Sequence, residues 1–273
     1  MKKRRQGKAG FASQGASRGN HPSPPLAEKQ RITPNRQHGF SQGERPYDYS
    51  FYESEPASPE YMARLFTRHD FNLTPPQLEL FWRFYLLLRQ HNASLDLTRI
   101  MGIEATVLKH FVDSAIITRW LDLAGPVLDI GSGPGFPGIP LAIMRPDLAF
   151  ILAESRGKRV GFLEEVVKSL ELANVELFPR SVREDSPLGV DCGRPVFDMV
   201  TRALEDMGKT LRRVVPFAAP GARIAFLKGP GSEAELSATR EAFATSYSLS
   251  LDHSYCLPGT DQRRRLLVFT RHS

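Results

Sequence analysis

The apolar positions of this chain follow two different periods. In residues 58–124 they recur at helical spacing, and Thr74-Pro75 is typical of an N-cap followed by a proline in the first helical turn. A broad apolar stripe follows at 78–88, and a further helix is expected over 104–121. The pattern predicts a small helical region over 58–124, with order beginning near Ser58.

After residue 125, short apolar runs typical of strands alternate with helical stretches. The strand-like runs are 127–130, 150–153, 175–178, 196–200 and 224–227. The helical stretches between them are 159–170, 207–215 and 233–244. Strands separated by such helices imply parallel pairing with right-handed crossovers, so residues 125–273 are predicted to form a doubly wound, mostly parallel α/β sheet. The last two runs, 247–256 and 265–270, predict a C-terminal antiparallel hairpin.

The positive charge of the chain is concentrated near its N-terminus. The chain has 273 residues and a net charge of +6, and the first 31 residues hold eight Lys and Arg side chains against one Glu. This stretch is rich in Gly, Ser, Pro and Gln and poor in large apolar residues, so burial cannot offset the entropy of ordering it. Residues 1–57 are predicted to be a disordered basic tail. It suits a solubilising extension or an arm that binds a polyanion, and its lack of an apolar face disfavours a transit peptide.

Cysteine content and hydropathy exclude several classes of protein. Two cysteines, Cys192 and Cys256, make neither a disulfide framework nor a four-ligand metal site, so a reducing, cytoplasmic location and no metal are expected. No stretch approaches the roughly 18 continuous apolar residues of a membrane helix, and the N-terminus lacks the apolar core of a secretory signal. A membrane protein or an exported protein is therefore not expected.

The candidate chemistry begins at the end of the first predicted strand, where residues 127–138 read VLDIGSGPGFPG. A glycine-rich turn here lets a ligand lie against the backbone at the edge where open α/β sheets bind cofactors. Three glycines spell the G-x-G-x-x-G of dinucleotide sites: Gly133, Gly135 and Gly138. Pro134 and Pro137, however, remove two amide donors from the loop, and the Asp129 carboxylate would face the phosphates. An anionic ligand is disfavoured.

The same carboxylate suits a cationic ligand. S-adenosylmethionine carries a sulfonium and an ammonium group, both of which Asp129 would attract. The second strand ends at Glu154, 23 residues after Gly131, in the place where a carboxylate accepts hydrogen bonds from ribose hydroxyls. The sequence favours S-adenosylmethionine as the cofactor over the alternative of a tight turn beside a solvated glutamate.

Several motifs together resemble one known family. They are the loop above with its proline-glycine ending, Leu97-Thr98, His110-Phe111-Val112-Asp113-Ser114, Glu154-Ser155-Arg156-Gly157-Lys158-Arg159, Thr201-Arg202-Ala203 and Leu227-Lys228-Gly229. From about Pro76 to Arg271 the chain resembles the bacterial 16S ribosomal RNA guanine-N7 methyltransferases, also called glucose-inhibited division protein B. The resemblance implies a class I methyltransferase fold in a monomeric cytoplasmic enzyme. The implied substrate is N7 of one guanine in 16S ribosomal RNA, either free or in a small-subunit particle.

The resemblance also implies which residues contact the cofactor. To Asp129, Gly133, Gly135 and Glu154 it adds Gly131, Phe136, the pair Val182-Arg183 after the third strand, and Arg202. Two positions depart from the family pattern: Asp96 stands where the family usually has Asn, and Arg183 stands where it usually has an acid. The second change is harmless if that contact runs through backbone amides, and it weakens cofactor binding if the contact needs the carboxylate.

Catalytic residues can be predicted from the chemistry of the reaction. Guanine N7 is a lone-pair nucleophile with no proton to remove, so its methylation needs alignment more than a general base. In agreement, the fourth strand lacks the Asn/Asp-Pro-Pro-aromatic signature of amino-group methyltransferases. Arg202 and Lys228, both at carboxyl ends of predicted strands, are the predicted catalytic pair, donating to guanine O6 or to an RNA phosphate. The alternative is that each pairs with a nearby carboxylate.

A histidine–aspartate pair, two basic runs and three other functions also fit parts of the sequence. His110 and Asp113 would share a helical face, which favours a core histidine held by a carboxylate over a substrate contact. Basic runs at 156–159 and 263–265 suit either a solvated surface or a clamp on the RNA backbone. The alternative functions are a methyltransferase acting on another RNA, a nicotinamide-dependent oxidoreductase and a non-catalytic RNA-binding scaffold. The loop prolines disfavour the second, and the intact loop with Glu154 disfavours the third.

Overall fold

The computed structural model describes residues 55–184, 196–202 and 205–272. The predicted disordered tail, apart from its last three residues, lies outside these ranges, as does Cys192. The first helix, α1 (Pro59–Arg68), begins after Ser58, whose hydroxyl caps it by accepting from the Tyr61 amide. The predicted start of order near Ser58 therefore coincides with a helix cap.

A seven-stranded sheet organises the described part of the chain, in the order β3-β2-β1-β4-β5-β7-β6. Its strands are β1 (Val127–Ile130), β2 (Phe150–Ala153), β3 (Val175–Phe178), β4 (Val196–Arg202), β5 (Ala218–Lys228), β6 (Tyr247–Cys256) and β7 (Arg263–Arg271). The first five strands pair in parallel, and β7 pairs antiparallel with both β5 and β6. The predicted doubly wound α/β fold with a C-terminal antiparallel hairpin is confirmed.

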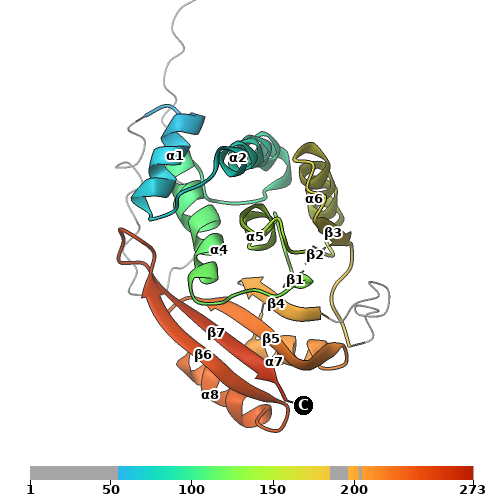
Figure 1. Cartoon of the computed structure of the whole chain (residues 1–273). Coiled ribbons are helices and arrows are strands. Elements are labelled where there is room, and N and C mark those ends of the chain that lie inside the picture. Colours follow the sequence, from blue (N-terminus) through green and yellow to red (C-terminus); the bar gives the residue numbers. More distant parts are fainter. Residues whose placement is uncertain (1–54, 185–195, 203–204, 273) are drawn as a thin grey trace, which may run out of the picture. The chain divides into compact units, whose positions relative to one another are not determined.

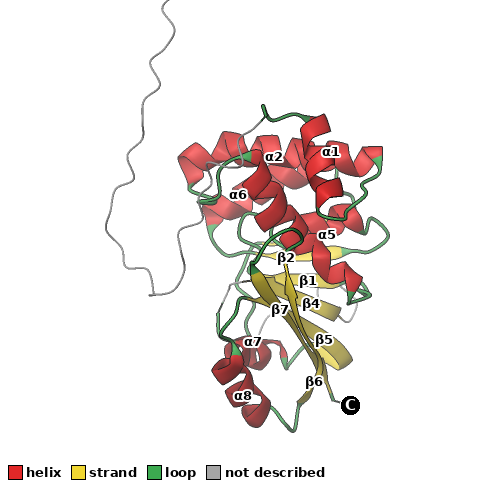
Figure 2. Cartoon of the chain, turned by 90° about the vertical axis from the view of Figure 1, so that its left-hand side faces the viewer, coloured by secondary structure: helices red, strands yellow, loops and turns green. Residues whose placement is uncertain are grey.

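Helices cover both faces of the sheet (Figures 1 and 2). Figure 2 shows α5 (Gly138–Met144) and α6 (Gly157–Ser169) on one side, and α7 (Met207–Val214) and α8 (Glu233–Ala242) on the other. Of these helices, α5 was not predicted from the sequence. Nearly all its residues are buried and its N-terminus has no side-chain cap, so neither an amphipathic period nor a capping signal marks it.

The N-terminal helices support the loop that follows β1. Helix α2 (Pro75–Leu95) begins with the predicted cap at Thr74, here a full capping box with Gln77, and packs against α5 and α6. Its Phe84 ring lies 5.4 Å from the ring of Phe136, a residue of the loop. Phe111, from the helical segment after α2, lies 5.6 Å from Phe84. The helical region thus shares one aromatic core with the loop.

The predicted single helix over 104–121 has a more varied form. It runs through α3 (Ile103–Thr106), the π-helical segment η2 (Val107–Val112), α4 (Asp113–Ala115) and the 3₁₀ segment η3 (Ile116–Arg119). A π-helical turn changes the angular spacing of side chains, and such turns occur frequently at functional sites. The sequence pattern predicted the helical path and missed this change of winding.

A buried ion pair ties three neighbouring segments at the start of the central strands. Asp198 of β4 is 1% exposed, and its carboxylate accepts two hydrogen bonds from the Arg223 guanidinium of β5, at 2.7 and 2.6 Å. It also accepts from the Ala124 amide at 2.6 Å, just before β1. The Arg223 guanidinium also donates to the Asp122 carbonyl at 2.6 Å, so one carboxylate and one backbone carbonyl hold this corner together.

We expect Asp198→Ala to lower the free energy of unfolding by about 2–4 kcal/mol, because it removes the carboxylate that pairs with the Arg223 guanidinium and accepts from the Ala124 amide. Urea unfolding followed by far-ultraviolet circular dichroism measures the change. Asp147→Ala is the control, since Asp147 pairs with Arg145 at the surface and its loss should leave the midpoint unchanged. Equal midpoints for both variants would contradict this account of Asp198.

Candidate functional site

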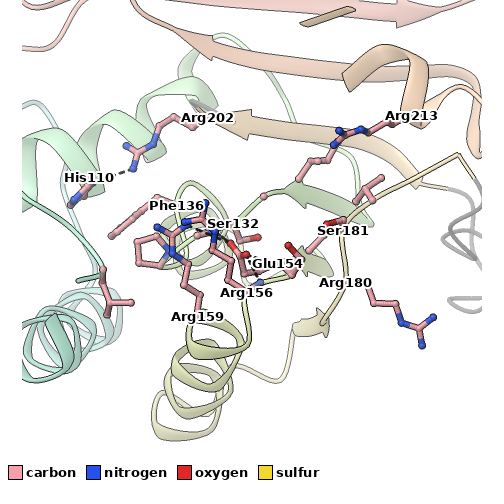
Figure 3. A pocket seen from close by; sticks show the side chains of 18 residues that line it. His110, Ser132, Phe136, Glu154, Arg156, Arg159, Arg180, Ser181, Arg202 and Arg213 are labelled. Carbon is pink, nitrogen blue, oxygen red and sulfur yellow. Dashed lines mark hydrogen bonds and ion pairs between the residues drawn. The ribbon is translucent and has the colours of Figure 1, made fainter. Parts of the chain in front are cut away.

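A cavity of about 400 Å³ opens at the carboxyl edge of the sheet, above β1, β2 and β4 (Figure 3). This volume lies within the roughly 300–1,000 Å³ typical of small-molecule sites. Six of the predicted site residues line it: Gly131, Gly133, Phe136, Glu154, Val182 and Arg202. The structure thus brings together residues from four separate motifs.

The loop from residue 131 to residue 139 uses all its backbone donors inside the protein. Pro134 and Pro137 have no amide hydrogen. The other donor–acceptor pairs are Gly131 and Ser132 to the Ala153 carbonyl, Gly133 to Glu154, Gly135 and Phe136 to the Ser132 carbonyl, Gly138 to Asp129, and Ile139 to the Gly135 carbonyl, all between 2.8 and 3.0 Å. A pyrophosphate needs several free amides in such a loop. This loop has none to offer unless an existing bond breaks.

Two glycines of the loop are required by close packing. A Cβ on Gly135, which has φ +101°, would lie 2.7 Å from Ile139 Cγ1. A Cβ on Gly138 would lie 2.2 Å from Leu152 Cδ2 and 2.6 Å from an Asp129 oxygen. Gly135, a predicted cofactor contact, does not line the cavity. Its lack of a side chain allows the tight course of the loop, and a direct contact with the cofactor stays a prediction.

Asp129 lies beneath the loop and not on the cavity wall. Its carboxylate is 0% exposed and accepts from the Gly138 amide at 2.9 Å, which anchors the start of α5. Burial raises the pKa of Asp129 to about 7, although the hydrogen bond from the Gly138 amide and the charge of Arg202 oppose that shift. In this structure the Asp129 carboxylate binds the Gly138 amide. Its direct attraction for a cationic ligand therefore stays a prediction.

Glu154 lines the cavity at the end of β2, as predicted. One of its oxygens accepts from the amides of Ser155 and Arg156, both at 2.8 Å, and the other accepts from the Gly133 amide at 2.9 Å. A carboxylate has about four acceptor positions, so Glu154 can still accept a further hydrogen bond. These contacts fix the carboxylate at the floor of the cavity.

Arg202 is held on several sides at the end of β4. It donates from Nη1 to the Lys109 carbonyl at 3.0 Å and to Asp113 at 3.3 Å, and from Nη2 to Nδ1 of His110 at 3.1 Å. Its guanidinium carbon lies 5.2 Å from the centre of the Phe136 ring. Nε–H and one Nη2–H have no partner among the described residues. A fixed guanidinium on the cavity wall therefore keeps donors for a ligand.

His110 is a neutral part of this network. Because Arg202 can only donate, His110 Nδ1 must accept, and Nε2 then donates to the Thr98 hydroxyl at 2.8 Å. Burial, together with the charges of Arg202 and Lys109, lowers its pKa well below 6.5. The ring stacks on Phe136 at 4.3 Å between centroids. The expected carboxylate partner was wrong.

The carboxylate of Asp113 instead joins two arginines. It lies 3.3 Å from Arg202 Nη1 and 3.1 Å from Arg264 Nε of β7. His110 and Asp113 both accept from the Arg202 guanidinium, so the two side chains meet through this arginine and not through a direct bond between them. A guanidinium and a hydroxyl hold the histidine in place of a carboxylate.

Lys228, the second predicted catalytic residue, does not line this cavity. Its ammonium donates to Glu235 of α8 at 2.8 Å and to the Glu205 carbonyl at 3.1 Å. This is the arrangement named as the alternative, pairing with a nearby carboxylate. The structure supports that alternative, and a catalytic role for Lys228 stays a prediction.

Both departures from the family pattern have a structural account. Asp96 caps α2 with φ +47°, a left-handed conformation that Asn and Asp adopt more readily than other side chains, so either residue suits the position. Val182 is 3% exposed and lines the cavity, whereas Arg183 is exposed and lies outside it. A side-chain contact from position 183 is not part of this cavity wall.

Several lining residues were missed as site residues. They are Leu97, His110, Ile130, Ser132, Pro134, Ala153, Ser155, Arg156, Arg159, Arg180, Ser181 and Arg213. Leu97 had a usable signal, because it precedes Thr98 in a family motif. Arg156, Arg180 and Arg213 come from three separate segments, and no local pattern links them. Among the described residues, no group of acidic, histidine and cysteine side chains could hold a metal ion, and no helix is long and apolar enough to cross a membrane.

The raised pKa of Asp129 predicts a pH dependence of stability. A carboxyl whose pKa is about 7 when folded and near 3.8 when unfolded holds its proton more tightly in the folded state, so its contribution to stability is lost as the pH rises from about 4 to about 7. Asp129→Asn should remove this loss. We expect the wild-type free energy of unfolding to fall more steeply over that pH range than that of the variant, and parallel curves from urea titrations would refute this prediction.

Comparison with known proteins places the chain in a family. The family model described as GidB, rRNA small subunit methyltransferase G, matches residues 77–265. A protein of Bdellovibrio bacteriovorus named ribosomal RNA small subunit methyltransferase G 2 is 38% identical over 211 residues, covering 77% of this chain and 80% of that protein. Ribosomal RNA small subunit methyltransferase G of Carboxydothermus hydrogenoformans is 34% identical over 212 residues, covering 76% and 88%.

A solved S-adenosylmethionine-dependent methyltransferase from Aquifex aeolicus is 20% identical, with a TM-score of 0.46, covering 62% of this chain and 93% of that chain. The family model, in contrast, spans well over half of the chain, and the two relatives exceed 30% identity over most of their length. The chain therefore belongs to the GidB family of small-subunit ribosomal RNA methyltransferases, which confirms the family predicted from its motifs.

Proposed function

We propose that the protein transfers the methyl group of S-adenosylmethionine to N7 of a guanine in 16S ribosomal RNA in the cytoplasm. Membership of the GidB family supports both the reaction and the small-subunit RNA as substrate. One structural observation carries the proposal: the loop amides are all engaged inside the protein, whereas a carboxylate and a fixed guanidinium line the cavity. That the enzyme acts as a monomer stays a prediction.

The residues of the cavity fit S-adenosylmethionine. Glu154 offers acceptor positions to ribose hydroxyls, and the buried side chains of Val182 and Ile130 offer apolar wall to an adenine. Gly131 and Gly133 have no side chains, so a ligand can lie directly against the backbone beside Glu154. When bound, the cofactor supplies an electrophilic methyl group on a sulfonium centre.

Arg202 is the residue best placed to orient the guanine. Guanine presents N7 and O6 as acceptors on one edge, and arginine commonly donates to both. N7 must keep its lone pair free in order to react, so O6 is the acceptor left for the spare N–H groups of Arg202. Asp113 and His110 fix the guanidinium, and such fixed orientation is what alignment of a nucleophile requires.

A nicotinamide dinucleotide fits this cavity less well. Its pyrophosphate would need amide donors that the loop over 131–139 has already used within the protein. Pro134 and Pro137 disfavour this ligand because they remove two amide donors from the loop. Every other amide of the loop donates to an acceptor within the protein, which disfavours a pyrophosphate for the same reason.

The proposal is tested with small-subunit ribosomal particles from cells that lack the protein. We expect tritium from labelled S-adenosylmethionine to enter 16S RNA at one guanine, close to one methyl per particle. Borohydride reduction followed by aniline should cleave the RNA there, because N7 methylation makes the base labile, and mass mapping identifies the position. Label that enters RNA without creating an aniline-sensitive site would contradict methylation at N7.

Substitution separates the roles of Arg202 and Lys228. Arg202→Ala should lower kcat by about 10²–10³-fold, as expected when a fixed donor in an active site is lost. If Lys228 is also catalytic, Lys228→Ala lowers kcat whereas Glu235→Ala does not. If Lys228 only joins β5 to α8, both of these variants keep kcat and lower thermal stability, Glu235→Ala more so because Glu235 also accepts from the Met207 amide at 2.6 Å. Wild-type kcat in Arg202→Ala would refute the role of Arg202.

A further inference from the structure

The cofactor cavity is unusually rich in arginine. Five arginines are among its lining residues, against a single lining carboxylate, Glu154: they are Arg156, Arg159, Arg180, Arg202 and Arg213, of which Arg180 points outward from the rim (Figure 3). Figure 3 shows Arg156 and Arg159 beside Glu154, Arg202 on the far wall and Arg213 across the opening. This composition is the reverse of what a cationic ligand alone would favour.

Two of the five arginines have no acidic partner in the described part of the chain. The partnered ones are Arg202 with Asp113 at 3.3 Å, Arg213 with Glu205 at 2.8 Å, and Arg159 with Glu154 at 3.8 Å. Arg156 and Arg180 are exposed and form no ion pair there, and Arg180 lies 5.7 Å from the centre of the Phe178 ring. Within the described residues, the rim of the cavity therefore carries two positive charges without an ion-pair partner.

Local stability does not explain the charge of Arg156. Arg156 is the N-cap of α6 and makes no side-chain capping bond, and the first turn of this helix holds Lys158 and Arg159 with no acid. Cations at a helix N-terminus oppose the helix dipole, which favours acids there. Residues that break a local rule without a compensating contact are expected where function requires them.

We propose that Arg156 and Arg180 form a docking surface for the sugar–phosphate backbone of the RNA, and that RNA on this surface strengthens binding of the cationic cofactor. The inference rests on the proposed function. It adds that the RNA substrate also strengthens cofactor binding at the same site. Phosphates neutralised by arginine contribute affinity without reading sequence, so the surface positions the strand and Arg202 remains free to orient the base.

The coupling follows from the charges of the ligands. S-adenosylmethionine has a net charge of +1, from a sulfonium and an ammonium against one carboxylate. Two uncompensated guanidinium groups at the rim repel it, and RNA phosphates remove that repulsion. Because coupling between two sites is reciprocal, the cofactor strengthens RNA binding by the same factor. After transfer the sulfur is neutral and the methylated guanine carries the positive charge, so the demethylated cofactor has no net charge and loses this coupling.

The test is the double variant Arg156→Ala/Arg180→Ala, which should shift the two affinities in opposite directions. Without RNA and at low salt, calorimetry should find S-adenosylmethionine bound about two- to fivefold more tightly, the effect of two charges across a solvated opening. S-adenosylhomocysteine should bind as it does to the wild type. RNA should bind more weakly, with a log–log salt slope shallower by about 1–2.

Matched controls keep the inference falsifiable. Arg68→Ala/Arg240→Ala removes two exposed arginines that do not line the cavity, and should leave cofactor affinity unchanged. If the rim substitutions only disturb the fold of the cavity, the double variant binds both S-adenosylmethionine and S-adenosylhomocysteine more weakly. That result would overturn the inference. Methylation of 16S RNA by the wild type is measured separately. If methylation occurs while cofactor affinity and salt slope stay unchanged in the rim variant, the docking surface is refuted and the proposed function stands.

Discussion

The saturation of backbone donors in the loop after β1 is the constraint on which the site depends. Each amide from residue 131 to residue 139 either is missing, at the prolines, or donates within the protein. Two buried carboxylates, Asp129 below and Glu154 beside the loop, act as acceptors that backbone carbonyls alone could not replace. The loop can therefore keep its tight course without a ligand, and it recognises one by shape and by neighbouring side chains.

The helical region before the sheet packs against this loop and extends its fixed geometry to Arg202. Phe136 leaves the loop and enters an aromatic core shared with α2 and η2, where it also supports His110 and Arg202. The guanidinium of Arg202 is fixed by a carbonyl, a carboxylate and a neutral histidine from that same helical segment. Arg202 is thus positioned by residues about ninety positions earlier in the sequence, and the N-terminal helical region contributes to the candidate site.

The sequence predicted those features whose signals are local. The bounds of β1, β2 and β3 follow from short apolar runs that end in glycine, acid or proline, and the cap of α2 follows from Thr74. Helix α5 lacked a signal because it is buried on nearly all sides. In the sequence, Arg202 and Lys228 have equivalent positions, because each is the last residue of a parallel strand. Only the position of Glu235 on the following helix decides that Lys228 turns away from the cavity, and that position depends on tertiary packing.

Charge is where sequence reasoning and the structure differ most. An acid at the tip of β1 predicts a negative site for a positive ligand, yet a strand covered on both faces gives no pattern for the direction of a side chain, and Asp129 is buried. The cavity wall is instead positive, from arginines that four separate segments contribute. Selection against a pyrophosphate must then come from the absence of free amides and not from repulsion. A methyl donor with a positive charge in such a cavity needs negative charge from elsewhere, and a nucleic acid substrate is a sufficient source.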